Sequence, residues 1–497
     1  MPPFEDLSRE ELIQKAREQW YELENLKRLL YGVKAERFTG SAAGENQLKL
    51  DLEGTNQSQP IAPVAPDEQI EKARQEIEKL RPAKALAQRG KQARQLLPAS
   101  LKREIIVLEP PQDVQGMKKI GTLVTEVLEY RAGELYVKRY ERPKYALPEG
   151  EGVIVASLPS RPIEKGIAGA SLLTHILVSK FVDHLPLDRQ IKMLRRNGII
   201  LPDATAGGWI PGACSLIQPL YKLLGQSVVG CSYVQIDETP IGVLDKKTKG
   251  KTHRGYHWVI HAPPLRAVYV SYHPGRDQDW PKGLLQGFEG HVQSDAYVAY
   301  NQFEKNPLII LHGCWAHVRR KFFEAQGNDR ERSEWMLQHI QWLYTIEDFA
   351  RINKYDPAQR QRLRQEKAPA VLETIHNWLL AEQGKTLPSS LIGKAIAYAL
   401  NNWSRLANYI QDGRVEIDNN LVENAIRPIA LGRKNYLFAG SHDSARNAAM
   451  IYSFFATCAK HDINPNDWLT DILERLPDHP VNRLAELLPQ NWSMKSS

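Results

Sequence analysis

The chain has 497 residues, with 65 Lys and Arg residues against 58 Asp and Glu residues and a formal net charge of +7 at pH 7. This length exceeds what one hydrophobic core organises, so several domains are expected, and the basic balance favours a polyanionic partner. The 4 cysteines form no Cys-x-x-Cys pair, and neither a secretory leader nor a run of about 18 apolar residues occurs, which predicts a cytoplasmic protein without a disulfide framework.

A capping box opens the first predicted element. Ser8 and Glu11 have the Ser-x-x-Glu spacing, and heptad-like apolar residues follow them. The pattern predicts a coiled coil over residues 8–37 that associates with a second copy of the chain; alternatively, the apolar stripe packs against its own chain. Residues 38–66 are polar, contain proline and lack periodicity, as expected of a flexible linker.

Two small modules are predicted next. Residues 67–103 combine an amphipathic helix with a basic segment, which either contacts phosphates or is simply solvated. Residues 104–152 form a small β-rich module, with a hairpin predicted about Arg131, Ala132 and Gly133. Basic and aromatic positions interleave along this hairpin, so the module is a candidate DNA-binding element.

Residues 160–228 show helical periodicity. The stretch LDRQIKMLRRNGIILPDATAGGWIPG predicts a helix, a glycine-containing turn and a second helix that carries Thr205 and Trp209, which is a helix-turn-helix-like arrangement. Gly207 and Gly208 each weaken the second helix by about 1 kcal/mol relative to Ala. A plain helical connector is therefore the open alternative, and no base contacts are assigned to this region.

Three strand-like stretches follow, YVQIDETPIGV, GYHWVIHA and RAVYVSYHP, and they indicate consecutive antiparallel strands. Because side chains alternate along a strand, Val234 and Ile236 are expected to face the core. Gln235 and Asp237 then share the opposite face. A rigid element would thereby display the carboxylate of Asp237.

A second acid is expected to meet the first. A short helix, a strand that ends near Asp295 and a further strand leading into a basic helix complete the order βββαβ and then βα. This is the order of a ribonuclease H-like fold, in which the middle of the first strand and the end of the fourth are neighbours. Residues 229–325 are therefore predicted as the first part of a catalytic core in which Asp237 and Asp295 lie together.

A third acid, Glu423, stands on the first turn of a helix that Asn420 can cap. Its spacing from Asn420 also fits a capping box, and its spacing from Arg427 fits an ordinary i to i+4 pair, so spacing alone favours a structural role. The long interval between the second and third acids indicates extra helices. The remaining predicted segments are a helical insertion at 326–412, the second part of the catalytic core at 413–460 and a C-terminal helical tail at 461–497.

Three converging carboxylates repel one another unless cations lie among them, and hard oxygen ligands select Mg²⁺ or Mn²⁺ over zinc. Two such ions about 4 Å apart activate a water or a 3′-hydroxyl group and stabilise the departing oxygen of an in-line phosphodiester displacement. Asp237, Asp295 and Glu423 therefore predict a site for two Mg²⁺ or Mn²⁺ ions with the chemistry of strand cleavage and strand joining.

Taken together, these residues resemble the transposases of the insertion sequence 66 family. The likeness rests on the blocks LYGVKAERF, RPKYA, LLTHILVSKFVDHLPLDRQ, IDET, SDAYVAY, GCWAHVRRKF, DNNLVENAIRPIALGRKNYLFAGS and LERLPDHPVNRLAELLPQNW, and it covers almost the whole chain. IDET and SDAY are weak signals alone, whereas their order among the longer blocks is specific. The resemblance implies that Asp237, Asp295 and Glu423 are the family's acidic triad.

The resemblance also implies partners and a location. A DNA transposase of this kind would act on the ends of its element and on target DNA, as a homodimer or higher oligomer and with accessory proteins of the same element. It would reside in the bacterial cytoplasm and associate with the nucleoid when bound to DNA.

No zinc is expected. Many relatives carry a cysteine-based zinc module before RPKYA, but residues 104–150 contain no cysteine. His312, Cys314 and His317 could be imagined as zinc ligands, but a junction of strand and helix is the better interpretation of these residues.

Basic residues are candidate contacts to DNA phosphates, with surface solvation as the alternative. They are Arg319, Arg320, Lys321, Arg427, Arg433, Lys434 and Arg446 near the acids, and Arg89, Lys91 and Arg94 in the N-terminal basic segment. Two other functions stay open, namely a catalytically silent DNA-binding regulator derived from a transposase and another ribonuclease H-like nuclease. The predicted fold class is multidomain α+β, with a coiled coil, a β-rich module, a helix-turn-helix-like region and a ribonuclease H-like domain that carries a helical insertion.

Overall fold

The computed structural model describes most of the chain from residue 159 onward and short pieces before it. The described residues are 133, 135, 137, 144–146, 153–155, 159–164, 166–199, 202–245 and 251–493. The chain divides into two compact units, Lys79–Pro159 and Met1–Glu78 with Ser160–Ser497. The predicted coiled coil at 8–37, the linker at 38–66 and the basic segment at 67–103 lie outside the described residues.

The unit Lys79–Pro159 contains a pair of described strands. β1 (Lys144–Ala146) and β2 (Val153–Val155) are antiparallel, and Lys144 lies opposite Val155. The hairpin predicted about residues 131–133 falls almost wholly outside the described residues. The strand pair in the structure lies further along: β1 falls near the end of the region 104–152 that was predicted to be rich in strands, and β2 falls just beyond it.

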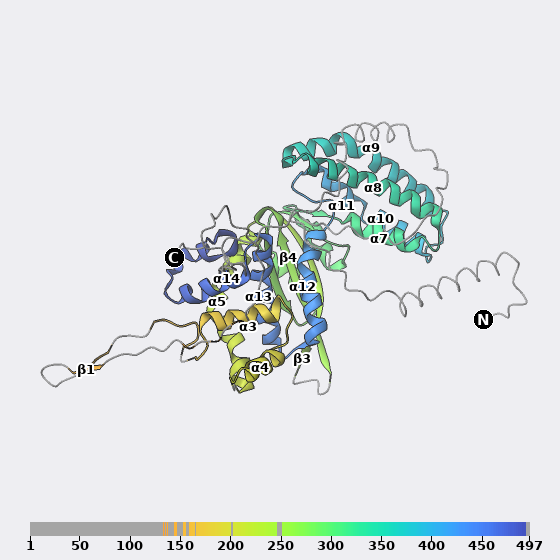
Figure 1. Cartoon of the computed structure of the whole chain (residues 1–497). Coiled ribbons are helices and arrows are strands. Elements are labelled where there is room, and N and C mark those ends of the chain that lie inside the picture. The colour runs from red at the N-terminus through yellow and green to blue at the C-terminus, as the bar shows by residue number, and fades with distance from the viewer. Residues whose placement is uncertain are drawn as a thin grey trace, which may run out of the picture. The chain divides into compact units, whose positions relative to one another are not determined.

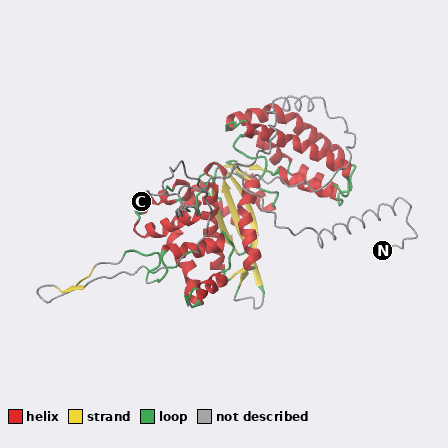
Figure 2. Ribbon diagram, in the orientation of Figure 1, coloured by secondary structure: helices red, strands yellow, loops and turns green. Residues whose placement is uncertain are grey.

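In the described part of the second unit, one mixed six-stranded sheet forms the centre (Figure 1, Figure 2). Its strands are β3 (Tyr233–Leu244), β4 (Thr252–Ala262), β5 (Ala267–His273), β6 (Gly290–Gln293), β7 (Ile309–His312) and β8 (Phe438–Ala439). The order is β5-β4-β3-β6-β7, with β8 paired to the C-terminal end of β3. β3, β4 and β5 are antiparallel neighbours, as predicted, whereas β6, β7 and β8 join in parallel.

Helices surround this sheet and extend beyond it. They are α3 (Ala170–Phe181), α4 (Leu187–Arg196), α5 (Asp203–Val229), α6 (Asp279–Leu284), α7 (Trp315–Ala325), α8 (Arg330–Ile352), α9 (Pro357–Gln383), α10 (Leu391–Asn401), α11 (Trp403–Ala407), α12 (Asn420–Tyr436), α13 (His442–Lys460) and α14 (Pro465–Arg475). Short 3-10 helices are η2 (Pro263–Leu265), η3 (Val298–Lys305), η4 (Asn408–Gln411), η5 (Leu476–Asp478), η6 (Val481–Leu487) and η7 (Pro489–Asn491). Among the described residues, no helix combines the length and apolar character that a bilayer crossing requires.

Strand β3 contributes to two hydrophobic cores because its side chains alternate. Val234 and Ile236 belong to the larger core, as predicted, and both are fully buried. Tyr233 belongs to the smaller core. Gln235 shares the face of Tyr233 and is also fully buried, so other segments of the chain cover this second face of the strand.

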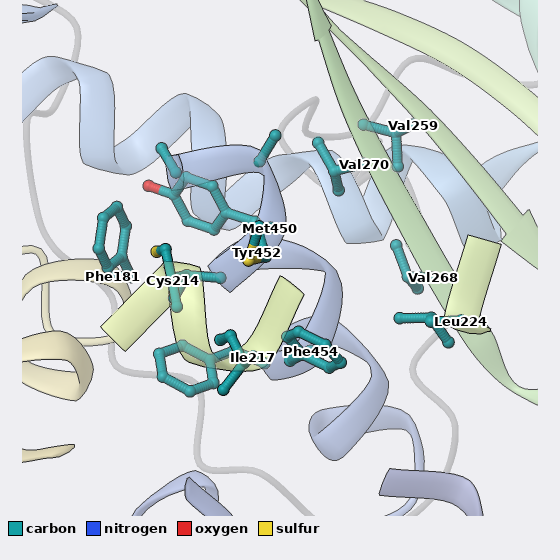
Figure 3. Packing of buried hydrophobic residues seen from close by; sticks show 14 of the residues in the cluster. Phe181, Cys214, Ile217, Leu224, Val259, Val268, Val270, Met450, Tyr452 and Phe454 are labelled. Carbon is teal, nitrogen blue, oxygen red and sulfur yellow. The ribbon is translucent and has the colours of Figure 1, made fainter. Parts of the chain in front are cut away.

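The larger core lies between the sheet and helices α3, α5, α13 and α14. Figure 3 shows Ile217 and Leu224 of α5 together with Phe454 of α13 in this core. Helix α13 also covers the outer strand of the sheet, because the backbone N–H groups of Val268 and Val270 donate to its hydroxyls, Thr457 Oγ1 at 3.0 Å and Ser453 Oγ at 2.8 Å. These bonds satisfy edge groups that would otherwise be free to pair with another chain.

The smaller core is mainly helical. It joins α7 to helices α8, α9 and α10, which occupy much of the stretch 326–412 that was predicted to be helical. Between α8 and α9, the buried Arg364 of α9 donates from Nε to Glu347 Oε1 at 2.7 Å and from NH2 to Glu347 Oε2 at 2.8 Å. This two-bond pair is a strong, directional link between α8 and α9.

Helices α4 and α5 form the region predicted to resemble a helix-turn-helix. Helix α5 is 27 residues long and continues through Gly207 and Gly208. Ala206, Trp209 and Ala213 are all buried on one face of it, and Trp209 is only 4% exposed. Burying large apolar side chains contributes roughly 1.5–3 kcal/mol each, which offsets the cost of two glycines.

Candidate active site

The first predicted acid, Asp237, lies in the middle of β3, opposite Val259 of β4. It is half-buried, and its Oδ1 accepts a hydrogen bond from the backbone N–H of Glu238 at 2.7 Å. β3 pairs with β4 on one side and with β6 on the other. Asp237 is thus fixed on a strand at the centre of the sheet.

The second acid, Asp295, follows the end of β6. In the parallel register of β3 and β6, Gln235 lies beside Gln293, and each acid comes two residues later along its own segment. Burial raises the pKa of both acids, and the charge of Asp295 raises the pKa of Asp237 further. The backbone N–H of Tyr297 donates to Asp295 Oδ1 at 3.0 Å and stabilises its charged form. The two acids are therefore neighbours, which is the juxtaposition that the strand order predicted.

The third acid lies on helix α12, whose beginning differs from the prediction. Asn419 is the N-cap residue and makes no side-chain cap bond, while the backbone N–H of Asn420 donates to Asp418 Oδ1 at 3.1 Å. The predicted cap at Asn420 is wrong, because Asn420 is already the first helical residue and the preceding aspartate accepts its N–H.

The carboxylate of Glu423 faces two side chains of α7. Its Oε1 lies 3.7 Å from His317 Nε2, and its Oε2 lies 3.7 Å from Arg320 NH2. Its charge also contributes to the raised pKa of Asp237, after burial and the closer acids. β3, the segment after β6 and α12 thus bring three carboxylates into one region.

The donor chemistry of these acids fits a divalent cation. Asp237 and Asp295 are both half-buried, offer hard oxygen donors and bring like charges together, which a cation such as Mg²⁺ would neutralise. The three side chains do not converge on one point as they stand, since no group of three His, Cys, Asp or Glu side chains in the described residues is arranged to hold a metal ion. Glu423 is turned toward α7, so its side chain would have to rotate to become a third ligand.

A fourth acid next to the site was not predicted. Glu238 is buried, and its oxygens accept hydrogen bonds from Arg276 Nε at 2.8 Å and from the Tyr300 hydroxyl at 2.8 Å. The Arg276 guanidinium lies 3.8 Å from the centroid of the Tyr297 ring. Glu238 is therefore neutralised by a cation of the chain itself, unlike Asp237. Only its position beside Asp237 could have indicated it, because Arg276 comes from a distant turn.

A buried polar network links the three segments that carry the acids. Gln235 Nε2 donates to Gln293 Oε1 at 2.9 Å and to the Asp418 carbonyl at 3.0 Å. Its Oε1 accepts from the backbone N–H of Val422 at 3.1 Å. Gln293 Nε2 donates in turn to the Gly313 carbonyl at 3.0 Å. Because α12 begins among these contacts, the network fixes the start of that helix against β3 and β6.

Helix α10 also reaches the acids. Burial and the neighbouring charge of Asp295 raise the pKa of Tyr398, although a hydrogen bond with the backbone of Ala296 lowers it. The ammonium group of Lys321 lies 4.6 Å from the centroid of the Tyr398 ring. The helical region that was predicted as an insertion thus places an aromatic side chain beside the acids.

The predicted phosphate contacts differ in their surroundings. Arg320, Arg427, Lys434 and Arg446 are exposed, Arg319, Lys321 and Arg433 are half-buried, and Arg89, Lys91 and Arg94 lie outside the described residues. Arg433 NH1 donates to Thr239 Oγ1 at 2.7 Å and to the Pro240 carbonyl at 2.6 Å. Arg433 therefore holds α12 against β3, and Arg446 pairs with Asp443.

His312, Cys314 and His317 make separate contacts at the junction of β7 and α7. His312 Nε2 lies 2.8 Å from His291 Nδ1, and Cys314 Sγ accepts from the backbone N–H of Asn419 at 3.5 Å. His317 faces the first turn of α12 instead. These contacts hold the junction of strand and helix against its neighbours.

Comparison with known sequences assigns the family. Residues 165–447 match the pattern of the Transposase IS66 family, and residues 453–490 match that of the IS66 C-terminal element. The chain belongs to the IS66 family of transposases. This confirms the resemblance found in the sequence, and DNA is the substrate class of a transposase. The matched region 165–447 contains all three acids of the candidate site.

Relatives of this IS66 family member occur in Sinorhizobium fredii. The uncharacterized protein y4hP is 32% identical, over 96% of this chain and 88% of its own length. The uncharacterized protein y4jD is 32% identical, over 95% of this chain and 94% of its own length. The uncharacterized protein y4qI is 33% identical, over 78% of this chain and 75% of its own length. The similarity therefore extends well beyond the region of the acids.

Proposed function

We propose that this transposase cleaves DNA at the ends of its element and joins those ends to target DNA, with Asp237, Asp295 and Glu423 as its catalytic acids. The observation that carries the proposal is the parallel register of β3 and β6, which sets Asp237 beside Asp295, together with the packing of α12, which carries Glu423, on β3. Crowded, partly buried carboxylates of like charge are costly to the fold unless a cation joins them. A site for divalent ions offsets that cost.

The strand order supports a ribonuclease H-like catalytic domain. Three antiparallel strands are followed by two parallel ones, and the acid of the first strand lies beside the acid that follows the fourth. Helices α8 to α11 are then an insertion in this domain, because β8 rejoins the same sheet after them and α12 packs on β3 and β4.

Asp237 and Asp295 would hold the divalent ions, and Glu423 would complete their ligands after turning from α7. When bound, two Mg²⁺ or Mn²⁺ ions activate the attacking oxygen and stabilise the departing oxygen of an in-line phosphodiester displacement. The protein itself orients the acids. Strands β3 and β6 fix the first two carboxylates, and the hydrogen bonds of Gln235 and Gln293 fix the start of α12. In strand joining one phosphorus–oxygen bond forms as another breaks, so the number of phosphodiester bonds is unchanged.

DNA phosphates would be held beside the acids by cations of α7. Arg320 and Lys321 lie next to Glu423 and Tyr398, respectively. A homo-oligomer and accessory proteins of the same element are further proposed partners, since joining two element ends to one target requires several DNA segments at once.

The test is cleavage and joining of labelled DNA that bears the element's terminal repeats, in Mg²⁺ or Mn²⁺ and with the element's accessory proteins supplied. Asp237→Asn, Asp295→Asn and Glu423→Gln are compared with the wild type. Glu324→Gln, which removes an exposed carboxylate of α7, is the matched control. We expect both reactions in the wild type and the control, and DNA binding without either reaction in the three variants.

The alternatives give other results. Cleavage without joining would identify a nuclease of another kind, and binding without any reaction in the wild type would identify a regulatory protein. Unchanged activity of Glu423→Gln would remove that residue from the triad and return it to a structural role.

A further inference from the structure

The outer surface of helix α4 is strongly basic. Arg189, Lys192, Arg195 and Arg196 are all exposed, while Gln190, Ile191 and Leu194 are buried on the inner face. Lys192 forms an i to i+4 pair with Asp188, which is the acidic residue of this helix. Within the described part of the chain, the three arginines show no ion pair with a carboxylate. Their charge is therefore available to a partner.

The following helix offers no comparable surface. The exposed positions in the first half of α5 are Ala204, Gly207, Gly208, Pro211 and Ser215, and none of these side chains is charged. Trp209 points into the larger core. In most helix-turn-helix proteins the second helix reads base edges in the major groove. Here the first half of the second helix has no arginine or lysine, and its one cation, Lys222, lies in the second half, whereas the first helix carries several cations on its exposed face.

We propose that the exposed face of α4 binds the phosphate backbone of duplex DNA, and that this helix pair positions the duplex without reading its sequence. Arg189 and Arg196 are seven residues apart, or about 10 Å along the helix axis. Successive phosphates of one strand advance about 3.4 Å along the duplex axis, so this face spans about three of them. The inference rests on the proposed function in one respect, namely that DNA is the ligand.

Other exposed cations connect this face with the acids. The first turn of α12 carries Glu423, which faces Arg320 of α7. Further along, α12 exposes Arg427 and Lys434, which are seven residues apart and so lie on the same side of the helix. Helix α3 packs against both α12 and α4, as Figure 1 also shows. Lys180 of α3 places its ammonium group 4.6 Å from the ring centroid of Tyr436, at the end of α12. Helix α3 thus links the end of α12 to α4, and a duplex bound along α12 would have α4 close to it.

The test measures DNA binding by the full-length protein without divalent metal, so that no reaction occurs. A fluorescent duplex with the terminal repeat and one of random sequence are titrated at several salt concentrations. The variant combines Arg189→Gln, Arg195→Gln and Arg196→Gln. The control combines Arg351→Gln, Lys354→Gln and Arg362→Gln, which removes three exposed cations from α8, from the turn after it and from α9.

We expect the α4 variant to bind both duplexes roughly 10- to 100-fold more weakly, with a salt slope lower by about 3, because each phosphate contact contributes about 0.9 to that slope. The control should keep the wild-type affinity and slope. Because all six positions are exposed, both variants should unfold at nearly the wild-type temperature.

The outcomes separate the two proposals. If the wild type binds DNA and the α4 variant binds it with the same affinity and slope, the α4 surface is excluded while the proposed function stands. An equal loss in the control would mean that net charge alone sets affinity, and it would also overturn the inference. A loss for the terminal repeat only would show that α4 reads sequence, contrary to the inference. If the wild type binds no DNA, the proposed function itself fails.

Discussion

Gln235 and Gln293 face each other across the parallel strands β3 and β6, and Nε2 of Gln235 donates to Oε1 of Gln293 at 2.9 Å. Both side chains are fully buried. Each stands two residues before one of the neighbouring acids, Asp237 and Asp295. Breaking a hydrogen bond between buried amides costs free energy, so this pair holds Asp237 and Asp295 in fixed positions relative to each other.

Gln235→Leu should therefore impair the reaction more than it impairs the fold. The change leaves the N–H of Val422 and the carbonyl of Asp418 without their partner, at about 1–3 kcal/mol for each buried group. Helix α12 would then lose its fixed start. We expect a lower unfolding temperature and a loss of cleavage, with DNA binding retained.

A neighbouring variant separates the two effects. Ile236→Val alters the same strand on its other face and should cost roughly 0.5–1.5 kcal/mol through lost packing. Cleavage rates and unfolding temperatures are measured for both variants. If the loss of cleavage merely follows the loss of stability across the two, the glutamine has no positioning role.

Breaking the buried ion pair of the smaller core should be strongly destabilising. Arg364 and Glu347 are both fully removed from solvent. Arg364→Met leaves a buried carboxylate with fewer partners, so we expect a loss of about 3–5 kcal/mol in the free energy of unfolding. Arg351→Met breaks the exposed pair with Asp348 and should cost no more than about 1 kcal/mol. Denaturant unfolding of both variants decides this, and equal losses would contradict the prediction.

Stability should depend on pH through Asp418. Burial raises the pKa of this acid to about 6 despite hydrogen bonds from Asn420 and the Tyr344 hydroxyl. The folded protein thus favours the protonated acid more than the unfolded chain does. Ionisation therefore lowers stability as the pH rises from about 4 to about 6, by about 3 kcal/mol in total, and has no further effect above that range.

The measurement compares wild type and Asp418→Asn at several pH values. The free energy of unfolding of the wild type, minus that of the variant, should fall between about pH 4 and pH 6 and then level off. Asp467→Asn, at an exposed position, controls for the loss of a surface carboxylate. A constant difference across this range would show that Asp418 is not the group that titrates.

Divalent metal should stabilise the protein through the acids. Burial and nearby acids raise the pKa of Asp237, so without a cation its charged form is less favourable than that of an exposed aspartate. Saturating Mg²⁺ should raise the unfolding temperature, since binding to the folded state alone contributes about 2.7 kcal/mol at one hundred times the dissociation constant. Asp237→Asn should be more stable than the wild type without Mg²⁺ and should respond little to it. KCl at equal ionic strength is the control, and an equal Mg²⁺ response in both proteins would refute the assignment.

Part of the acid site could be predicted from the sequence, because the alternation of side chains along a strand and the order of the strands can both be read from it. Alternation along β3 correctly placed Val234 and Ile236 in the core, and the strand order correctly brought Asp237 and Asp295 together. It did not predict the glutamine network, since Gln235 meets Asp418 and Val422 across separations of 183 and 187 residues. Buried amides at such distances leave no periodic signal.

The role of Glu423 could not be predicted from spacing along the chain either. Spacing favoured a capping box for this residue, and the resemblance to a family was needed to nominate it as an acid of the site. In the structure its carboxylate faces His317 and Arg320 of α7. Local spacing describes what a side chain can reach within its own helix, and it says nothing of what another helix brings to it.

By itself, then, the sequence determined the features that depend on near neighbours: the antiparallel strands from β3 to β5, the helices between 326 and 412, and the motifs that assign the IS66 family. The tertiary structure decided which side chains meet, including the pairing of Glu238 with Arg276 and the burial of Trp209 on α5. The physical reason is that periodicity follows from backbone geometry over a few residues, whereas burial and charge pairing depend on how distant segments pack.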